Sequence, residues 1–495
     1  MTTAQDLISF AHEALQERQF IAAIQREPYT HNPTPEGVRA ERSIGGVTVL
    51  LDSILRKTGG LMVAVAAGEA DKEVLNAEGK VAVPPGEESY QLKRIFLTKK
   101  EQDQFYYGFS NQTLWPLCHG VFVKPLFRSS WWRTYAKVNH RFAKSILQEI
   151  KGKDAFVWIN DYHLALLPKM LREMDANISI GIFWHIPWPT VEIFRICPWR
   201  REILEGLLGA DLVGFHRYYH VDNFIDSLRE EIGVVVESEP RSVLYRKRLT
   251  KLVHLPTGID TGEIDDVIKR SQPITRDILK KDLGLNITSK YLLLSVDRID
   301  YTKGMVEWLR ILDRFLEKYP QYRNLITQLM IGVPSRLAIP AYKTYHRKVH
   351  KLVQRINEKY SHNGWQPIHF ITHAIERNRL FAYYRLADIG LVSPLDDGMN
   401  LVAKEFAIAA DPDKSALVLS RFAGAAKDLH SAIHINPYDT EGSADALNYA
   451  LNMNREERRH RNAEMRHILE ENNIYRWGIE FIKNTTSENL AQKYL

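Results

Sequence analysis

The polar residues most suggestive of chemistry lie in SPLDDGMNLVAKEFAIAA, residues 393–410, where two adjacent aspartates and a Gly-Met-Asn turn precede a helical pattern. Capping explains one carboxylate and a glycine before a helix, because the cap satisfies the first N–H groups and suits the helix dipole. Helix capping does not require a second carboxylate, and it does not explain Glu405 within the same segment. The stretch therefore predicts a ligand site at the start of the helix.

A second polar motif, VDRIDYTKG at residues 296–304, places Arg298 and Lys303 in a strand-to-helix loop. Two cations at that point can clamp a diphosphate leaving group and stabilise the negative charge that develops on it. A solvated basic loop is the alternative explanation for the motif taken alone.

A glycine pair in SIGGVTVLLDSIL, residues 43–55, includes Gly46 and opens a predicted helix. Glycine lets the backbone approach a ligand closely, and the first N–H groups of a helix bind phosphate. An ordinary turn is the alternative reading. The sequence has no GxGxxG fingerprint, which argues against a hydride-transferring dinucleotide enzyme.

Two further segments combine ring side chains with stiff or apolar surroundings. His185 stands in FWHIPWPT, where prolines stiffen the loop, so it can hydrogen-bond a sugar hydroxyl or stabilise charge. A neutral histidine satisfied by the backbone is the alternative. In FYYGFSNQTLWPLCH, residues 105–119, Tyr106 and Trp115 can line a polyol pocket, or they can be core aromatics.

Neither metal nor disulfide chemistry is predicted. The DPD sequence at residues 411–413 resembles a metal-binding pair of aspartates, but Pro412 makes it a turn between a helix and a strand. The two cysteines, Cys118 and Cys197, exclude a disulfide framework and a cysteine-based zinc site. So few cysteines suit the reducing cytoplasm.

The elements that must position these residues form two series of apolar strands separated by helical patterns such as residues 306–319. Near-continuous apolar strands that alternate with helices predict parallel sheets covered on both faces. The first series comprises residues 20–25, 61–68, 92–98, 155–161, 178–187 and 211–216. The second comprises residues 251–259, 291–300, 325–334, 368–373, 388–394 and 415–422. Two doubly wound domains are expected, with a boundary near residues 255–275.

Most of the candidate residues follow predicted strands. Ligands of doubly wound sheets bind outside the carboxyl ends of the strands, and two such domains facing each other would leave a cleft. Core packing alone does not explain so many polar residues at strand ends. The residues concerned are Arg26, Asp161, His163, His185, Arg298, Lys303, Arg336 and the segment Asp397 to Glu405.

Length and charge limit the class of protein. A chain of 495 residues suits two large domains, and its net charge of +6 is mild for that length. The sequence has no basic run with interleaved aromatics, so a nucleic-acid partner is not expected. The first twenty residues form an amphipathic helical pattern rather than a signal peptide, and no apolar run is long enough to span a membrane.

Five motifs in order resemble the trehalose-6-phosphate synthase family, glycosyltransferase family 20: DYHLALLP, HIPWPTVEIF, VDRIDYTKG, DDGMNLVAKEF and SRFAGAA. The related glucosylglycerol-phosphate synthases look similar. The resemblance implies an α/β fold of the GT-B type, with two Rossmann-like doubly wound domains facing a central cleft. It implies an N-terminal helical extension (residues 1–19), an acceptor-binding domain (20–260, with a returning helix at 475–495) and a nucleotide-sugar-binding domain (261–474).

The resemblance also implies roles for individual residues. Arg298 and Lys303 would hold the donor diphosphate, and His185 and Asp397 the transferred glucose. The remaining donor-binding residues would be Gly46, Asn400, Leu401 and Val402 through backbone N–H groups, and Glu405 through the ribose. The acceptor-binding residues would be Arg26, Tyr106, Trp115, Asp161 and Arg336.

The implied reaction transfers glucose from a nucleotide sugar, most simply UDP-glucose, to glucose 6-phosphate with retention of configuration. Two cations in a water-poor cleft would stabilise the departing UDP, so no cofactor or metal is expected. The sequence has no obvious glycosidase-like pair of carboxylates, which is consistent with front-face attack. A separate phosphatase would act on the product. A non-catalytic regulatory relative is the alternative, although the residues of the diphosphate clamp are all present.

Several positions depart from the family pattern. Asp396 stands where an arginine is common, and Asn160 replaces the usual histidine before DYH. The first strand ends in REPY, which is similar to the glucosylglycerol-phosphate group, whereas Arg336 and His163 favour a hexose phosphate. Glucose 6-phosphate is therefore the expected acceptor and glycerol 3-phosphate the alternative. The sequence does not decide the donor base, the regulation, or whether the chain forms a homo-oligomer.

Overall fold

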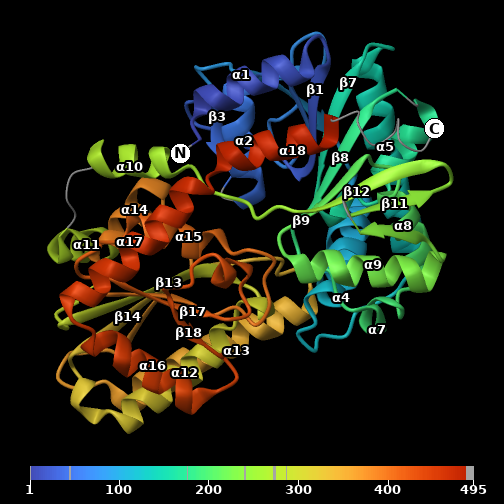
Figure 1. The fold of residues 1–495 in the computed structure, drawn as a ribbon. Helices are drawn as coiled ribbons and strands as arrows, with labels where there is room; N and C mark the ends of the chain where they lie inside the picture. Colours follow the sequence, from blue (N-terminus) through green and yellow to red (C-terminus); the bar gives the residue numbers. More distant parts are fainter. Residues whose placement is uncertain are drawn as a thin grey trace. The chain divides into compact units, whose positions relative to one another are not determined.

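The computed structural model describes residues 2–43, 46–175, 177–238, 241–270, 275–285 and 287–486. The chain divides into two compact units (Figure 1). Unit 1 comprises Met1–Gly258 and Asn472–Leu495, and unit 2 comprises Ile259–Glu471. Unit 2 is thus inserted into unit 1 along the chain. The division expected from the sequence lies at residues 260 and 474, and residues 487–495 of the expected returning helix lie outside the described part.

Unit 1 is built on a ten-stranded sheet of order β10-β11-β12-β9-β8-β7-β1-β4-β6-β5. The strands from β12 to β6 in this order are parallel, and β5, β10 and β11 pair antiparallel at the edges. Their bounds are β1 Gln19–Arg26, β4 Leu61–Val65, β5 Lys80–Val83, β6 Tyr90–Ile95, β7 Ala155–Asn160, β8 Ser179–Trp184, β9 Leu212–Phe215, β10 Val235–Ser238, β11 Arg241–Tyr245 and β12 Arg248–His254. Every residue of β4, β7 and β9 is buried, as expected for strands covered on both faces.

Helices surround this sheet and supply its covering layers. Among them α1, α2 and α18 pack against one another, and α5 packs against α6, which in turn contacts α8 (Figure 1). The helices are α1 Ala4–Leu15, α2 Gly46–Thr58, α3 Lys99–Gln102, α4 Trp115–His119, α5 Ser129–Ile150, α6 Leu167–Met174, α7 Val191–Phe194, α8 Arg200–Leu207, α9 Tyr218–Ile232 and α18 Ile474–Thr486. The first helix begins with a capping box between Thr3 and Asp6.

The last described helix, α18, completes unit 1 although it lies more than two hundred residues beyond the rest of that unit. Its Phe481 ring stacks on Trp158 of β7, with centroids 4.0 Å apart and planes at 12°. A Cβ added to Gly181 of β8 would approach the Phe481 ring to 2.7 Å, so the glycine leaves room for the ring on the sheet. This packing makes α18 part of the core of unit 1.

Unit 2 has a six-stranded parallel sheet of order β15-β14-β13-β16-β17-β18. Its strands are β13 Tyr291–Ile299, β14 Ile326–Pro334, β15 Ile368–Ile371, β16 Ile389–Val392, β17 Ala416–Ser420 and β18 Ile433–Ile435. Its helices are α10 Thr261–Arg270, α11 Arg276–Leu283, α12 Met305–Lys318, α13 Pro340–Tyr360, α14 Arg377–Leu386, α15 Leu401–Ala409, α16 Thr440–Asn452 and α17 Arg455–Glu471. Alternate residues of β13 enter two hydrophobic clusters: Leu292 and Leu294 belong to one, and Leu293 belongs to the other.

Some elements differ from the sequence-based expectation. A hairpin of β2 (Tyr29–Thr34) and β3 (Gly37–Arg42) follows β1, and its second strand is largely exposed, so no apolar run marked it. The aromatic segment contains a π-helical stretch, Asp103–Leu114. Arg298 lies within β13, whereas a strand-to-helix loop was expected, because the pairing with β14 continues to Ile299. In the described part of the chain, no helix is long and apolar enough to cross a membrane.

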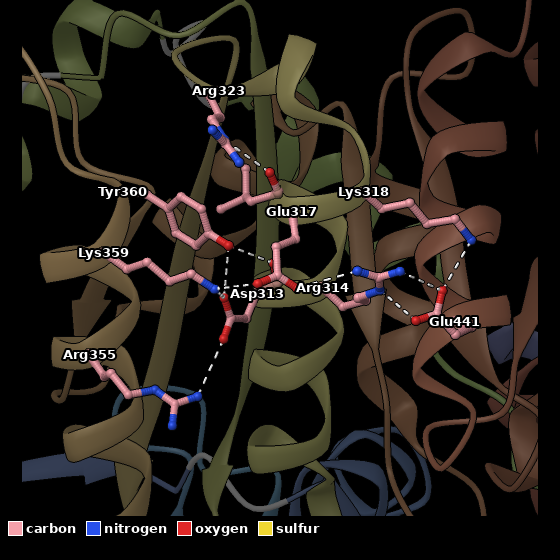
Figure 2. A network of polar contacts seen from close by, with 10 residues as sticks. Asp313, Arg314, Glu317, Lys318, Arg323, Arg355, Lys359, Tyr360 and Glu441 are labelled. Carbon is pink, nitrogen blue, oxygen red and sulfur yellow. Dashed lines mark hydrogen bonds and ion pairs between the residues drawn. The ribbon is translucent and has the colours of Figure 1, made fainter.

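A network of ion pairs ties α12 to α13 and α16 on the surface of unit 2 (Figure 2). Asp313 of α12 accepts hydrogen bonds from Lys359 Nζ at 2.7 Å, Tyr360 Oη at 2.9 Å and Arg355 at 3.3 Å. The side chain of Arg355 is 65% exposed, whereas that of Asp313 is only 15% exposed. The members of this network therefore differ in how strongly water screens them.

Replacing Arg355 by alanine is expected to change the free energy of unfolding of unit 2 by less than ~0.5 kcal/mol, because exposed ion pairs contribute little. Replacing Asp313 by alanine is expected to cost about 1–2 kcal/mol, because Lys359 and the hydroxyl of the buried Tyr360 lose a charged acceptor. Urea unfolding of the two variants beside the unchanged protein measures the difference. Equal losses would contradict this ranking.

Candidate active site

In each unit the chain adds strands first on one side of its first parallel strand and then on the other side. In unit 1 the chain runs from β1 to β4 and β6 on one side and then to β7, β8 and β9 on the other. In unit 2 it runs from β13 to β14 and β15, and then to β16, β17 and β18. Doubly wound sheets bind ligands outside the carboxyl ends of the strands at such a switch point. The switch points lie between β1 and β7 and between β13 and β16.

Three predicted residues stand at the carboxyl edge of the unit 1 switch point. Arg26 ends β1, Asp161 follows β7 and His185 follows β8, and these strands are neighbours in the sheet. The backbone N–H of His185 donates to Asp161 Oδ1 at 3.2 Å. The ends of β7 and β8 are therefore joined directly through residues predicted to bind sugars.

The imidazole of His185 is fixed by Asn160, the last residue of β7. Asn160 Nδ2 donates to the carbonyl of Trp158 at 3.4 Å, and this orients Asn160 Oδ1 toward His185 Nε2 at 3.1 Å. An amide oxygen only accepts, so Nε2 carries the proton and Nδ1 is the acceptor. Asn160, noted in the sequence only as a departure from the family pattern, thus sets the tautomer of His185.

Burial determines the charge of His185. Its side chain is 7% exposed, and desolvation lowers its pKa to about 3. The imidazole is therefore neutral at physiological pH. Of the two roles considered from the sequence, hydrogen bonding to a sugar hydroxyl fits this state, and stabilisation of negative charge by an imidazolium does not.

The aromatic candidates pack beside the segment that follows β7. The Tyr106 ring stacks on His163 with centroids 5.9 Å apart and planes at 13°. The Trp115 ring lies 5.8 Å from that of Tyr162 and is 6% exposed, whereas Tyr106 is half-buried. Tyr106 thus has more exposed surface for a ligand than Trp115.

Arg26 and the start of α2 are held together through the backbone. Thr48 Oγ1, in the first turn of α2, donates to the carbonyl of Arg26 at 3.3 Å. Gly46 is the first residue of α2, and Gly45, its partner in the predicted glycine pair, lies outside the described residues. The predicted phosphate-binding helix start therefore lies near the carboxyl end of β1.

The unit 2 switch point contains a polar chain that links the ends of β13 and β16. Lys303, in the 3-10 turn Tyr301–Lys303 after β13, forms an ion pair with Asp397, which follows β16. Asp397 Oδ2 also accepts from Asn400 Nδ2 at 3.0 Å. Lys303 is followed by Gly304, which has φ of +66° and lies so close to the carbonyl of Ser393 that a Cβ would approach it to 2.0 Å. This close contact requires glycine in the YTKG motif.

Asn400 also caps α15. Its Oδ1 accepts from the N–H of Ala403 at 3.1 Å, rather than from the N–H groups of Leu401 and Val402. Glu405 lies one turn into the same helix, where Arg377 approaches its carboxylate to 3.8 Å. Burial raises the pKa of Glu405. The helix is therefore capped by the amide of Asn400 and not by a carboxylate, as the capping explanation from the sequence had it, and capping does not explain Glu405.

The structure separates the two predicted arginines of unit 2. Arg298 lies near the end of β13, on the strand beside the switch point. Arg336 follows β14, and its guanidinium hydrogen-bonds to Tyr342 Oη at 2.6 Å and to the fully buried Asp300 at 3.3 Å. Arg336 thus belongs to unit 2, whereas the other predicted acceptor residues belong to unit 1.

Carboxylates beside Lys303 have raised pKa values. Burial raises the pKa of Asp297 to about 6, and Lys303 Nζ lies 3.9 Å from its Oδ1. Burial and the neighbouring Asp397 raise the pKa of Asp396 well above its usual range. The raised pKa favours the neutral form of Asp396, which lessens the like charge that its replacement of the family arginine places beside Asp397. Asp297 was missed from the sequence although it adjoins Arg298 in the VDRIDYTKG motif.

Backbone geometry singles out some of the same residues. Asp161, Arg336 and Asn400 have φ angles of 73°, 50° and 79°, a region that non-glycine residues rarely adopt. Such conformations concentrate at functional sites, where surrounding contacts impose them. No sequence pattern predicted these angles.

The predicted turn at the DPD motif is confirmed: Asp411 Oδ1 accepts from the N–H of Asp413 at 3.0 Å. Among the described residues, no three histidine, cysteine, aspartate or glutamate side chains cluster closely enough to hold a metal ion. The absence of a metal requirement remains a prediction, because the reaction itself has to test it.

Comparison with known proteins identifies one family over almost the whole chain. The sequence profile of glycosyltransferase family 20 matches residues 17–487. A trehalose-6-phosphate synthase of Mycobacterium marinum is 36% identical over 481 residues, covering 95% of this chain and 94% of that protein.

Solved structures agree with the sequence match. Trehalose-6-phosphate synthase from E. coli bound with UDP-2-fluoro glucose has a TM-score of 0.83 and 32% identity, over 95% of this chain and 99% of the other. A UDP-forming α,α-trehalose-phosphate synthase from Burkholderia xenovorans in complex with glucose 6-phosphate has a TM-score of 0.83 and 32% identity, over 95% and 100%. The fold is GT-B, and the chain is a hexosyltransferase that belongs to glycosyltransferase family 20.

Proposed function

We propose that this enzyme transfers glucose from UDP-glucose to glucose 6-phosphate, forming trehalose 6-phosphate and UDP. One observation carries the proposal: Lys303 and Asp397, from the two strands that flank the unit 2 switch point, contact each other beside the start of α15. A cation, a carboxylate predicted to bind sugar and a helix start thereby lie together at the carboxyl edge of the sheet. The ligands named for the two related crystal structures support the choice of substrates.

On the donor side, Arg298 and Lys303 bind the diphosphate and stabilise the negative charge that grows on its β-phosphate as the glycosidic bond breaks. The N–H groups of Asn400, Leu401 and Val402 at the start of α15 add to this stabilisation, and Gly46 contributes a backbone N–H. Asp397 accepts hydrogen bonds from the glucose hydroxyls, and Glu405 accepts them from the ribose.

On the acceptor side, Arg26 and Arg336 bind the phosphate of glucose 6-phosphate. Tyr106 and Trp115 present ring surfaces to the sugar, and Asp161 accepts from its hydroxyls. The neutral His185 accepts a hydrogen bond from a hydroxyl of the transferred glucose through Nδ1, which its contact with Asn160 leaves as an acceptor.

Transfer proceeds with retention of configuration by front-face attack. The departing phosphate accepts the proton of the acceptor hydroxyl, so no carboxylate nucleophile is required. The leaving group is stabilised by the two cations, so no metal ion is required. A separate phosphatase acts on trehalose 6-phosphate.

Release of UDP tests the proposal. The donors UDP-, GDP- and ADP-glucose are each combined with glucose 6-phosphate, glycerol 3-phosphate or fructose 6-phosphate, with and without EDTA. UDP release is expected with UDP-glucose and glucose 6-phosphate, unchanged by EDTA. Preference for glycerol 3-phosphate would replace the proposed acceptor, and no release with any sugar phosphate would favour a regulatory relative instead.

A further inference from the structure

A buried charge cluster lies directly behind Arg26 and has no part in the proposed mechanism. Glu27, the next residue, is fully buried, and its Oε2 accepts from Arg94 Nε of β6 at 2.7 Å. Its Oε1 accepts from the backbone N–H of Ala67, after β4, at 2.6 Å. Glu27 therefore joins the end of β1 to two neighbouring strands.

The same arginine connects the cluster to the β2–β3 hairpin. Arg94 donates to the carbonyl of Tyr29 at 3.0 Å and contacts His31 Nδ1 at 2.7 Å, both in β2. Asp71, which is also fully buried, lies 3.1 Å from Arg94 and accepts from the backbone N–H groups of His31 at 2.9 Å and Gly68 at 2.7 Å. Each member of this cluster has a polar partner, as buried charges require.

The charges of the cluster balance when one carboxyl group holds a proton. Asp71 accepts several hydrogen bonds and has a lowered pKa, so it is the ionised carboxylate. Burial and the adjacent Asp71 raise the pKa of Glu27 to about 8. His31 has a lowered pKa because of burial and Arg94, so it is neutral. One cation, one anion and a protonated Glu27 then face one another.

The local backbone shows why this cluster matters for Arg26. The register between β1 and β4 shifts between Ile24 and Arg26, so β1 carries a bulge at its carboxyl end. A bulge can re-aim the following side chains, and here Arg26 is exposed while Glu27 is fully buried. Because the two residues adjoin, the hydrogen bonds of Glu27 restrict the direction in which Arg26 can point.

We propose that Glu27, held by Arg94 and Asp71, is a positioning residue that orients Arg26 toward the phosphate of the acceptor. This inference rests on the proposed function, in which Arg26 binds that phosphate. Glu27 does not contact the substrate. It acts through Arg26 by fixing the bulged end of β1 against β6 and the segment after β4.

Steady-state kinetics of Glu27→Ala and Glu27→Gln test the proposal. Glu27→Ala removes the acceptor of Arg94 Nε and the link from the end of β1 to β6. The KM for glucose 6-phosphate is expected to rise roughly ten- to a hundredfold, with smaller changes in kcat and in the KM for UDP-glucose. Glu27→Gln keeps an oxygen for Arg94 and offers an amide N–H to Asp71. The N–H of Ala67 loses Oε1 of Glu27 as an acceptor but keeps Asp71 Oδ2 at 3.1 Å. At pH 7 its acceptor KM is expected to stay within about threefold of the unchanged protein.

Glu149→Gln is the matched control. Glu149 pairs with Lys93, which precedes Arg94 on β6 and therefore projects to the opposite face of the sheet. Breaking this pair disturbs the same strand without touching the cluster, so the acceptor KM is expected to be unchanged. In a background of Arg26→Ala, Glu27→Ala is expected to add no further rise in the acceptor KM, since its effect passes through Arg26.

The pH dependence supplies a second readout. The pKa of Glu27 is raised from its ordinary value of 4.5 to about 8, so the folded state binds this proton more tightly than the unfolded chain. The resulting stability is present at low pH and is lost as pH rises toward 8. Above pH 8 the acceptor KM of the unchanged protein is expected to rise, and that of Glu27→Gln to stay level. The urea midpoint is expected to fall more steeply between pH 6 and 8.5 for the unchanged protein than for Glu27→Gln.

The outcomes separate the inference from the proposed function. Normal turnover by the unchanged protein with an unaltered acceptor KM in Glu27→Ala overturns the inference alone. So does an additive effect in the Arg26→Ala background. If Glu27→Ala does not fold, the comparison with Glu27→Gln above pH 8 decides, and parallel pH profiles overturn the inference. Absence of UDP release by the unchanged protein overturns the proposed function and the inference together.

Discussion

Replacing Arg298 by alanine is expected to reduce kcat for UDP-glucose turnover by roughly a hundred- to a thousandfold. The reason is that a hydrogen-bond donor directed at the charge developing on the leaving phosphate acts mainly in the transition state. Arg298 lies near the end of β13, beside the ion pair of Lys303 with Asp397. The KM for UDP-glucose is expected to change less, since ground-state contacts to the nucleotide remain. Steady-state UDP release at saturating acceptor measures the effect.

Two controls accompany this variant. Arg310→Ala removes an exposed arginine from α12 of the same unit and is expected to leave kcat unchanged. Arg298→Lys keeps the charge but loses the two-pronged geometry of the guanidinium, so an intermediate kcat is expected. Near-normal turnover in Arg298→Ala would refute the diphosphate clamp.

Replacing Phe481 by alanine is expected to lower the free energy of unfolding of unit 1 by about 3–5 kcal/mol, the usual cost of removing a buried aromatic side chain. Its ring is fully buried, stacks on Trp158 and lies over Gly181, which has no side chain of its own to occupy the space. Chemical denaturation followed by tryptophan fluorescence can measure the loss, because Trp158 and Trp477 both lie within reach of the ring.

Lys483→Ala is the matched control for Phe481→Ala, since Lys483 lies on the exposed side of the same helix. Its effect is expected to stay within about 0.5 kcal/mol. A loss of less than about 1 kcal/mol for Phe481→Ala would show that α18 is dispensable for unit 1. A large loss would mean that unit 1 needs α18, the helix that follows unit 2 in the chain, for its stability.

Local sequence patterns predicted many of the strands and their order along the chain. Runs such as FIAAIQ and AFVWIND are apolar on both sides of the strand, and such runs occur in parallel sheets whose faces are both covered. The observed strands β1 and β7 begin or end within a residue of those runs. Since ligands bind at the carboxyl ends of such strands, the positions of Arg26, Asp161 and His185 followed from the same patterns.

Two elements outside the ten-stranded and six-stranded sheets were not predicted, for a physical reason. The β2–β3 hairpin is partly exposed, so it lacks the apolar run that marks a buried strand. The π-helical stretch of the aromatic segment has no such marker either. These elements depend on packing against the rest of unit 1, and propensity alone does not specify them.

By itself, the sequence determined the alternation of strands and helices, most members of the two series of strands and the polar residues that end them, because these features depend on the order of neighbouring residues. The run at residues 251–259 was assigned to the second series, whereas β12 pairs with β9 in the sheet of unit 1. Only the tertiary structure decided the partners of those residues. The amide of Asn160 fixes the tautomer of His185, Asp397 pairs with Lys303, and Glu27 pairs with Arg94. Each pair joins different strands, and its geometry and pKa values arise only where folding brings the two groups together away from water.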